Sequence, residues 1–213
     1  MSPKKKPSPA LGRKSAYVAR NRAHILKATI EVLATDGQHP AVEHVSERAE
    51  IAMSTIYKHF KNRDELFAAA MGAAMADWEE WVFSKLAHIP DPLEQLVFPM
   101  RMIARLKSTH PTYAKLIENN LALSATQLPF VAGFPKHVHE LISAGVLKMD
   151  HPDIRIQDFQ GLLFSLVVNQ STNPAAKVED ADLAIEIGLS LLNISAAKAR
   201  KISHAKLPDL SDN

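Results

Sequence analysis

The chain contains no cysteine in its 213 residues. This absence excludes disulfide bonds, thiolate nucleophiles, cysteine-ligated metal sites and redox sensing through thiols. No stretch approaches the ~18 uninterrupted apolar residues that a membrane helix needs, and no apolar core follows the N-terminal lysines. We therefore predict a cytoplasmic protein that makes no membrane contact.

Sequence signatures of catalysis are also missing. The chain has neither a glycine-rich phosphate loop nor a Gly-x-Ser-x-Gly motif. Its carboxylate pairs, Glu79 with Glu80 and Asp180 with Asp182, fit solvated helix faces or a helix N-terminus. An enzyme is the weakest functional class, and we predict no catalytic residue and no cofactor.

Two histidines close together, His137 and His139, raise the question of a metal site. On a helix, residues two apart point about 200° away from each other. No third ligand stands at a matching spacing, and a site would need a distant partner such as His110. We predict no metal site, and His137 remains a candidate for orienting a ligand.

Positive charge is concentrated at the N-terminus, although the net charge is only +2. Residues 1–22 contain no acidic residue and the following basic ones: Lys4, Lys5, Lys6, Arg13, Lys14, Arg20 and Arg22. Such a segment can attract DNA phosphates in a salt-dependent way. It also fits a disordered solubilising leader, because its prolines oppose a helix. The two interpretations are compatible.

The spacing of apolar residues over residues 45–67 predicts two short helices joined by a tight turn. Val45 and Ala49 lie four apart, and so do Ile56 and Phe60. Helices this short need a third helix to pack against. The apolar positions that supply it are Ala23, Leu26, Ile30 and Leu33, before Asp36 and Gly37 end the helix.

With Ile56 and Phe60 turned inward, the other side chains of the second short helix must face outward. Serine, threonine and methionine can meet base edges or the thymine methyl group, while tyrosine, lysine, histidine and arginine suit phosphate oxygens. The candidate DNA-binding residues are Glu43, His44, Met53, Ser54, Thr55, Tyr57, Lys58, His59, Lys61 and Arg63.

A family resemblance is carried by Ala49, Ile51, Thr55, Ile56, Tyr57, His59 and Phe60 and by the run Asn62, Arg63, Asp64, Glu65 and Leu66. This pattern resembles the DNA-binding head of the TetR (tetracycline-repressor-like) transcriptional regulators. The resemblance implies a dimeric repressor whose third helix enters the major groove and whose fourth helix leads into a ligand-sensing body. It also implies phosphate contacts for Tyr57 and His59, and base contacts for Thr55 and the two residues before it.

The chain departs from the family pattern at several positions. Glu50 replaces the usual turn glycine, and a positive φ there costs a non-glycine residue about 1 kcal/mol. Ala52 replaces the usual hydroxyl N-cap, which is worth about 1 kcal/mol. Ala41 and Val42 stand where the family favours threonines. These changes predict a looser head. Glu43 can accept from a cytosine amine, although a helix-dipole role is favoured.

Long helices are predicted after residue 64, and no strand-like alternation is evident. Pro90 and Pro92 end the first of them, and Pro99 is expected to interrupt the next. We expect the later helices at residues 92–108, 111–124, 136–144, 156–170 and 179–200, with an irregular connection at residues 129–135.

The last two helices combine apolar residues with small residues one turn apart. A glycine inside a helix costs nearly 1 kcal/mol relative to alanine, which suggests that another backbone approaches closely. We predict a four-helix dimer interface formed by Phe159, Gly161, Leu162, Ser165, Leu166, Ala184, Ile187, Gly188 and Leu191. The alternative is that both helices pack only on their own chain.

Aromatic residues and methionines in the middle helices suggest a pocket for an apolar or aromatic small molecule. The candidate ligand-binding residues are Trp78, Trp81, Phe98, Met102, Phe130, Phe134 and His137. The alternative is that these side chains fill a packed core.

Taken together, these patterns predict an all-α protein of about nine helices. The expected parts are a disordered basic arm (1–15), a helix-turn-helix domain (16–62), a ligand-sensing and dimerisation domain (63–203) and a disordered tail (204–213). The predicted function is a homodimeric transcriptional regulator, favoured as a repressor, which binds a palindromic DNA operator and is released by a small effector. Rival interpretations are a constitutive or architectural DNA-binding protein and a helical small-molecule-binding protein or enzyme.

Overall fold

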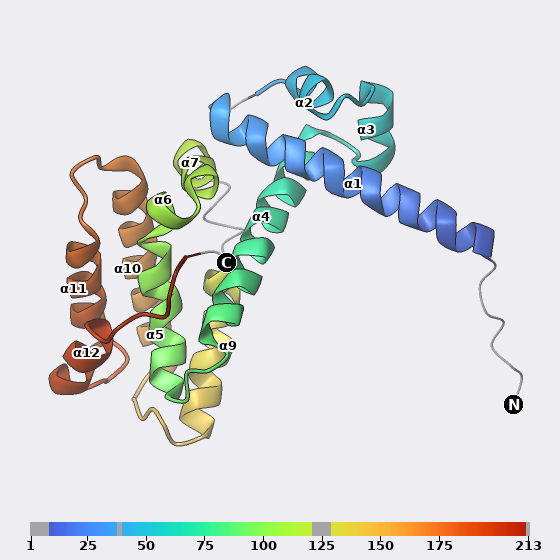
Figure 1. Cartoon of the computed structure of the whole chain (residues 1–213). Helices are drawn as coiled ribbons and strands as arrows, with labels where there is room; N and C mark the ends of the chain where they lie inside the picture. The colour runs from blue at the N-terminus through green and yellow to red at the C-terminus, as the bar shows by residue number, and fades with distance from the viewer. Residues whose placement is uncertain (1–8, 38–39, 121–128, 212–213) are drawn as a thin grey trace, which may run out of the picture.

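The computed structural model describes residues 9–37, 40–120 and 129–211, with side chains from residue 15 and, after the second gap, from residue 133. All regular elements in these residues are helices, which confirms the predicted all-α class (Figure 1). They are α1 (Pro9–Thr35), α2 (Val42–Ala49), α3 (Met53–His59), α4 (Arg63–Leu86), α5 (Pro92–Ile103), α6 (Leu106–Thr109), α7 (Pro111–Asn119), α9 (Pro129–Ser143), α10 (Pro152–Thr172), α11 (Val178–Gly188) and α12 (Ala196–Ser203). None of the helices in this part of the chain is long and apolar enough to cross a membrane.

Helices α1, α2 and α3 form a head at one end of the molecule, and the later helices form the body (Figure 1). The inward residues of the two short helices are as predicted. Val45 and Ile56 are fully buried, while Ala49 and Phe60 are 2% and 1% exposed. The burial of Ile56 and Phe60 fixes which side of α3 faces outward.

The buried side of α1 differs from the predicted one. Ile25 and Val32, two turns apart, are buried together with Leu33, whereas Ala23 is exposed and Leu26 is half-buried. Ala23 and Leu26 instead border a groove between α1, α4 and α7. Apolar periodicity within one helix does not reveal which neighbours will cover it, and here both α2 and α4 pack on α1.

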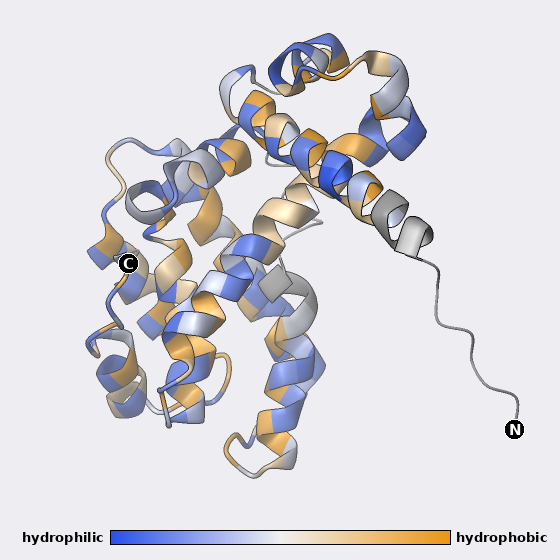
Figure 2. Ribbon diagram, turned by 45° about the vertical axis from the view of Figure 1, so that its right-hand side comes forward, coloured by the Kyte–Doolittle hydropathy of each residue, from blue (hydrophilic) through white to orange (hydrophobic). Residues whose placement is uncertain are grey.

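Helix α1 starts at Pro9, so the predicted disordered arm is wrong for its second half. Proline is tolerated at the first position of a helix, where its missing N–H has no intrahelical acceptor. Figures 1 and 2 show the N-terminal part of α1 projecting beyond α2 and α3. The first eight residues, with their three lysines, lie outside the described part.

Helix α4 leads from the head into the body. Its N-terminus is capped by Asn62, whose side-chain oxygen accepts a hydrogen bond from the Glu65 N–H at 2.8 Å. The Glu65 carboxylate accepts another hydrogen bond from the Lys61 N–H at 2.8 Å. Both side chains therefore satisfy backbone N–H groups at the start of α4. Met71 and Trp78 are among its buried side chains. In Figure 2, polar and apolar residues alternate around the body helices, as expected for helices with one buried side.

Proline has less effect on the body helices than predicted. Pro99 lies inside α5, which ends four residues later at Ile103 and is followed by the short α6. Residues 129–135, predicted to be irregular, form the first half of α9 with Pro135 inside it. Proline removes a backbone hydrogen bond, but its φ is compatible with a helix, and tertiary packing can hold the remaining turns together.

The helix predicted over residues 179–200 is two helices. α11 ends at Gly188, and Asn193 adopts a left-handed conformation with φ 57°. The Ile194 N–H donates to the Leu189 carbonyl at 3.2 Å, which closes the turn before α12. Asparagine tolerates this backbone conformation better than most residues do, so Asn193 allows the turn between α11 and α12. The helix predicted over residues 111–124 ends as α7 at Asn119, and its last residues lie outside the described part.

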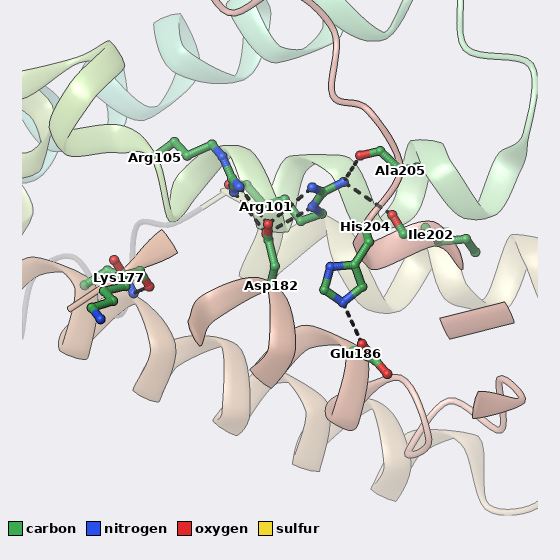
Figure 3. Close-up of polar contacts among 9 residues, drawn as sticks. Arg101, Arg105, Lys177, Asp182, Glu186, Ile202, His204 and Ala205 are labelled. Carbon is green, nitrogen blue, oxygen red and sulfur yellow. Dashed lines mark hydrogen bonds and ion pairs between the residues drawn. The ribbon is translucent and has the colours of Figure 1, made fainter. Parts of the chain in front are cut away.

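A buried ion-pair cluster joins α5 to α11 and to the end of the chain (Figure 3). Arg101 and Asp182 are 5% and 6% exposed. The Asp182 carboxylate accepts from Arg101 Nε at 3.0 Å and from Arg105 Nη2 at 2.7 Å. Arg101 Nη1 also donates to the carbonyls of Ala205 and Ile202 at 2.7 and 3.3 Å. The prediction that Asp182 is solvated is therefore wrong.

The end of the chain is packed rather than disordered up to residue 211. Leu207 and Leu210 are half-buried against the core. Lys85 Nζ donates to the Ser211 carbonyl at 2.6 Å. The prediction of a disordered tail is thus wrong for residues 204–211, because two leucines three positions apart give this segment an apolar side to bury.

Candidate nucleic-acid interface and body cavity

The turn between α2 and α3 has a left-handed backbone conformation that usually requires glycine, although the turn contains no glycine. Glu50 has φ 52° and ψ 35°, in the left-handed region. The Ile51 N–H donates to the Ser46 carbonyl at 3.1 Å, and Ser46 Oγ donates back to the Ile51 carbonyl at 2.7 Å. These two hydrogen bonds stabilise the turn and offset the unfavourable left-handed conformation of Glu50.

Side chains of α1 contact the C-terminal ends of both α2 and α3. His24 Nε2 lies 3.0 Å from the Ala49 carbonyl at the end of α2. The Arg22 guanidinium lies 4.3 Å from the centre of the Phe60 ring and donates to the His59 carbonyl at 3.3 Å. Sequence reasoning placed Arg22 in the basic arm and overlooked His24. These contacts offset the strained turn and the missing cap at Ala52, where no side chain bonds the start of α3.

The outward side of α3 carries the residues predicted to meet DNA. Tyr57 is 45% exposed, although it is a large aromatic residue. Ser54, Lys58 and Lys61 are also exposed. The half-buried members of the same face are Met53, Thr55, His59 and Arg63. The head thus presents hydroxyl, aromatic and basic side chains together on one short, supported helix and on the loop that follows it.

The two candidates on α2 differ in their surroundings. His44 Nδ1 lies 2.6 Å from Asp36 Oδ2, so its ring is held against the end of α1. Hydrogen bonds from Thr35 and from His44 keep the pKa of the Asp36 carboxyl below its ordinary value. Glu43 is exposed in the first turn of α2, where a carboxylate interacts favourably with the helix dipole, and no side chain caps that turn by a hydrogen bond.

A cavity of about 360 Å³ lies in the body between α4, α5 and α9. It is lined by Trp78, Glu79, Val82, Phe83, Leu86, Ala87, Gln95, Leu96, Pro99, Met100, Gly133, Phe134 and His137. Three predicted ligand-binding residues, Trp78, Phe134 and His137, therefore come together here. Most of the wall is apolar, as in small-molecule sites.

Other predicted ligand-binding residues lie away from this cavity. Phe98 and Met102 are 1% and 0% exposed in the packed core. The Trp81 ring packs edge-on against His110, with ring centres 4.5 Å apart. The side chain of Phe130 lies outside the described residues. Sequence reasoning missed Phe83, which lines the cavity and is 62% exposed.

Residues 25–70 match the family model for bacterial regulatory proteins of the tetR family. The matched segment contains the two short helices, the turn between them and the start of α4. This segment belongs to the tetR family of bacterial regulatory proteins. No curated protein matches it.

Several solved structures share the fold of this chain. RolR in complex with resorcinol is 18% identical, with 92% of this chain and 100% of RolR covered and a TM-score of 0.73. FadR from Bacillus halodurans, a fatty acid degradation regulator, is 19% identical, with coverage of 88% and 97% and a TM-score of 0.61. NalD from Pseudomonas aeruginosa, a repressor of a multidrug efflux pump, is 18% identical, with coverage of 82% and 96% and a TM-score of 0.60.

The predicted dimer residues of this chain divide between surface and core. Gly161 and Ser165 are exposed on α10, and nothing lies within 4 Å of where a Gly161 Cβ would be. On α11, Ile187 is 63% exposed, and Leu183, which was not predicted, is 49% exposed. The half-buried members are Leu162, Ala184 and Leu191.

Three further predicted dimer residues belong to the interior of their own chain. Phe159 is fully buried, and Leu166 is 6% exposed. A Cβ at Gly188 would lie 2.8 Å from Leu162 Cδ1 and 3.1 Å from Phe159 Cε2. The close approach that Gly188 permits is therefore between α10 and α11 of one chain, and the prediction that these buried residues face a partner is wrong.

The histidines considered for a metal site are engaged with separate carboxylates. His137 Nδ1 lies 3.7 Å from Glu140 Oε2, and His139 Nε2 lies 3.0 Å from Asp153 Oδ1. Among the residues that the structure describes, no group of three His, Cys, Asp or Glu side chains could hold a metal ion.

Proposed function

We propose that the chain acts as a cytoplasmic homodimeric repressor that binds a palindromic operator through α3 and releases it when a small apolar or aromatic effector occupies the body cavity. The observation that carries the proposal is the exposed face of α3, with Tyr57, Lys58 and Ser54 outward and Ile56 buried beneath them. A helix of this kind can enter a major groove and meet both bases and phosphates.

The cavity favours an effector-responsive regulator over a constitutive DNA-binding protein, whose body would need only a filled core. RolR binds resorcinol, a small aromatic molecule, and a FadR from Bacillus subtilis binds stearoyl-CoA. By analogy, we infer that the cavity at Trp78 and Phe134 is where this chain binds its effector. Operator titrations with a panel of aromatic compounds test this inference.

Exposed apolar residues on α10 and α11 support dimerisation through these helices. Leu183 and Ile187 lie four apart on one side of α11, and Gly161 leaves the surface of α10 open to another backbone. Two copies of this pair of helices would form a four-helix interface. A helix-turn-helix protein needs a second copy of its head to bind two half-sites of an operator.

The double substitution Leu183→Glu with Ile187→Glu is expected to convert a dimer into a monomer. Four carboxylates per dimer would have to be buried, and we expect the dissociation constant to rise at least about a hundredfold. Sedimentation velocity measures the change. Val146→Glu alters an apolar residue that is 39% exposed elsewhere and should leave the dimer intact. Identical sedimentation of the double variant and the unaltered chain would contradict the assigned interface.

Helix α7 joins the head to the body. The side-chain amide of Asn119 donates to the Ala34 carbonyl at 2.9 Å, and that of Asn120 donates to the Leu33 carbonyl at 3.3 Å. Both acceptors are last-turn carbonyls of α1. The hydroxyl of Tyr113, also on α7, donates to the Asp77 carboxylate on α4. We infer that effector binding tilts α4 and that α7 carries part of this movement to α1, which separates the two recognition helices.

The double substitution Asn119→Ala with Asn120→Ala is expected to uncouple the effector from the operator. Hydrogen bonds of this kind contribute about 1 kcal/mol each, so with two of them lost in each chain the effector-induced loss of operator affinity should shrink by about thirtyfold. Operator titrations with and without a ligand that acts on the unaltered chain measure this loss. Lys115→Ala, on the exposed side of α7, is the control. An unchanged effector response in the double variant would exclude this route.

A further inference from the structure

The charge of the body cavity is unbalanced. Among the described residues that line it, Glu79 carries a carboxylate and none is a lysine or arginine. The described lining of this cavity therefore carries an acidic side chain and no lysine or arginine.

The Glu79 carboxylate is half-buried on α4 and makes no hydrogen bond or ion pair within the described part of the chain. A carboxylate loses favourable hydration when a ligand covers it, and a cation restores a favourable interaction while an anion does not. The other ionisable lining residue, His137, has the Glu140 carboxylate 3.7 Å from its Nδ1, so a positive charge on its ring would have its own partner.

Three aromatic residues surround the same space. Trp78 and Phe83 line it from α4, and Phe134 lines it from α9. The Phe134 ring is held by stacking on Phe159, with ring centres 5.4 Å apart. The faces of aromatic rings carry negative electrostatic potential and attract quaternary ammonium and similar cations. The aromatic side chains and Glu79 thus both favour a positively charged ligand.

We propose that the cavity selects a lipophilic organic cation, with its apolar groups against the aromatic wall and its positive charge near Glu79. This inference rests on the proposed role of the cavity as the effector site and specifies the chemical class of that effector. Carboxylates and phosphate esters are not the preferred effectors under this proposal, because the described lining residues include no arginine or lysine to bind them.

Tetraphenylphosphonium and tetraphenylborate form a matched pair of probes, because they have nearly the same shape and opposite charge. Each is titrated into the full-length protein, and binding is measured by equilibrium dialysis. The unaltered chain should bind the phosphonium ion at least about tenfold more tightly than the borate ion. Glu79→Gln should remove most of that preference. Glu80→Gln, an equal charge change on an exposed neighbour outside the cavity lining, should preserve it.

Several outcomes would overturn the inference. Equal or tighter binding of the borate ion, or a preference that survives Glu79→Gln, would show that the cavity does not select cations through Glu79. Failure of both ions to bind would also overturn it. The preference in the unaltered chain is decisive even if a variant folds poorly, which circular dichroism would detect. Operator binding without ligand is measured separately, so a failure of the DNA-binding proposal would be seen independently of the probes.

Discussion

Replacing Tyr57 and Lys58 together with alanine is expected to lower operator affinity by about a thousandfold while leaving the fold intact. Each side chain is exposed on α3 and is assigned a phosphate contact. A dimer would lose four such contacts at about 1 kcal/mol each. Exposed substitutions of this kind usually change stability by no more than about 0.5 kcal/mol. Operator titration by fluorescence anisotropy and thermal unfolding measure the two effects.

The salt dependence of binding provides a second signature of the same variant. Loss of one lysine–phosphate contact in each head should reduce the slope of log affinity against log salt by about two. Lys27→Ala is the matched control, because it removes an exposed lysine that borders the groove between α1, α4 and α7. Retention of operator affinity by the double variant would show that α3 does not make the contacts assigned to it.

Asp182→Asn is expected to lower the free energy of unfolding by about 3–5 kcal/mol, because it leaves two guanidinium groups without their buried carboxylate. Asp91→Asn is the control. Asp91 pairs with Lys198 at 2.8 Å, but both side chains are about one-third exposed, so less than about 1 kcal/mol is expected. Asparagine also preserves the N-cap that Asp91 provides for α5. Urea unfolding at one fixed protein concentration measures the difference, and similar midpoints for the two variants would contradict the prediction.

The contribution of Asp182 to stability also depends on pH. Burial raises the pKa of this carboxyl. The hydrogen bonds and charges of Arg105 and Arg101 lower the pKa by more than burial raises it, so the pKa lies below its ordinary value of 3.8. A group whose pKa is lower in the folded state stabilises the fold fully above its unfolded pKa. The contribution should therefore be present at pH 7 and decline as pH falls below about 4.

The sequence predicted local features of the head better than the contacts between distant elements. The family resemblance implied a positive φ at Glu50, and helical periodicity predicted the burial of Ile56 and Phe60; the structure confirms both. The pairing of Arg101 with Asp182, 81 residues apart, has no local signature. The periodicity of neither helix indicates that their charged residues will meet.

Glycine illustrates the same limit at the candidate dimer interface. Gly161 and Gly188 both suggested the close approach of a partner chain. The space beside Gly161 is open, whereas Gly188 is packed against Leu162 and Phe159 of its own chain. A glycine inside a helix indicates that something approaches it, but the sequence does not specify which chain the neighbour comes from.

The role of the α3 face in operator recognition is tested most directly by selecting fragments of the source genome on the purified protein and sequencing those that remain bound. We predict enrichment of fragments that share an inverted repeat, with half-sites spaced so that two heads reach successive major grooves. The Tyr57→Ala and Lys58→Ala double variant should recover no enriched fragment. Bound fragments without a common motif, or the same enrichment with the double variant, would contradict operator recognition through α3.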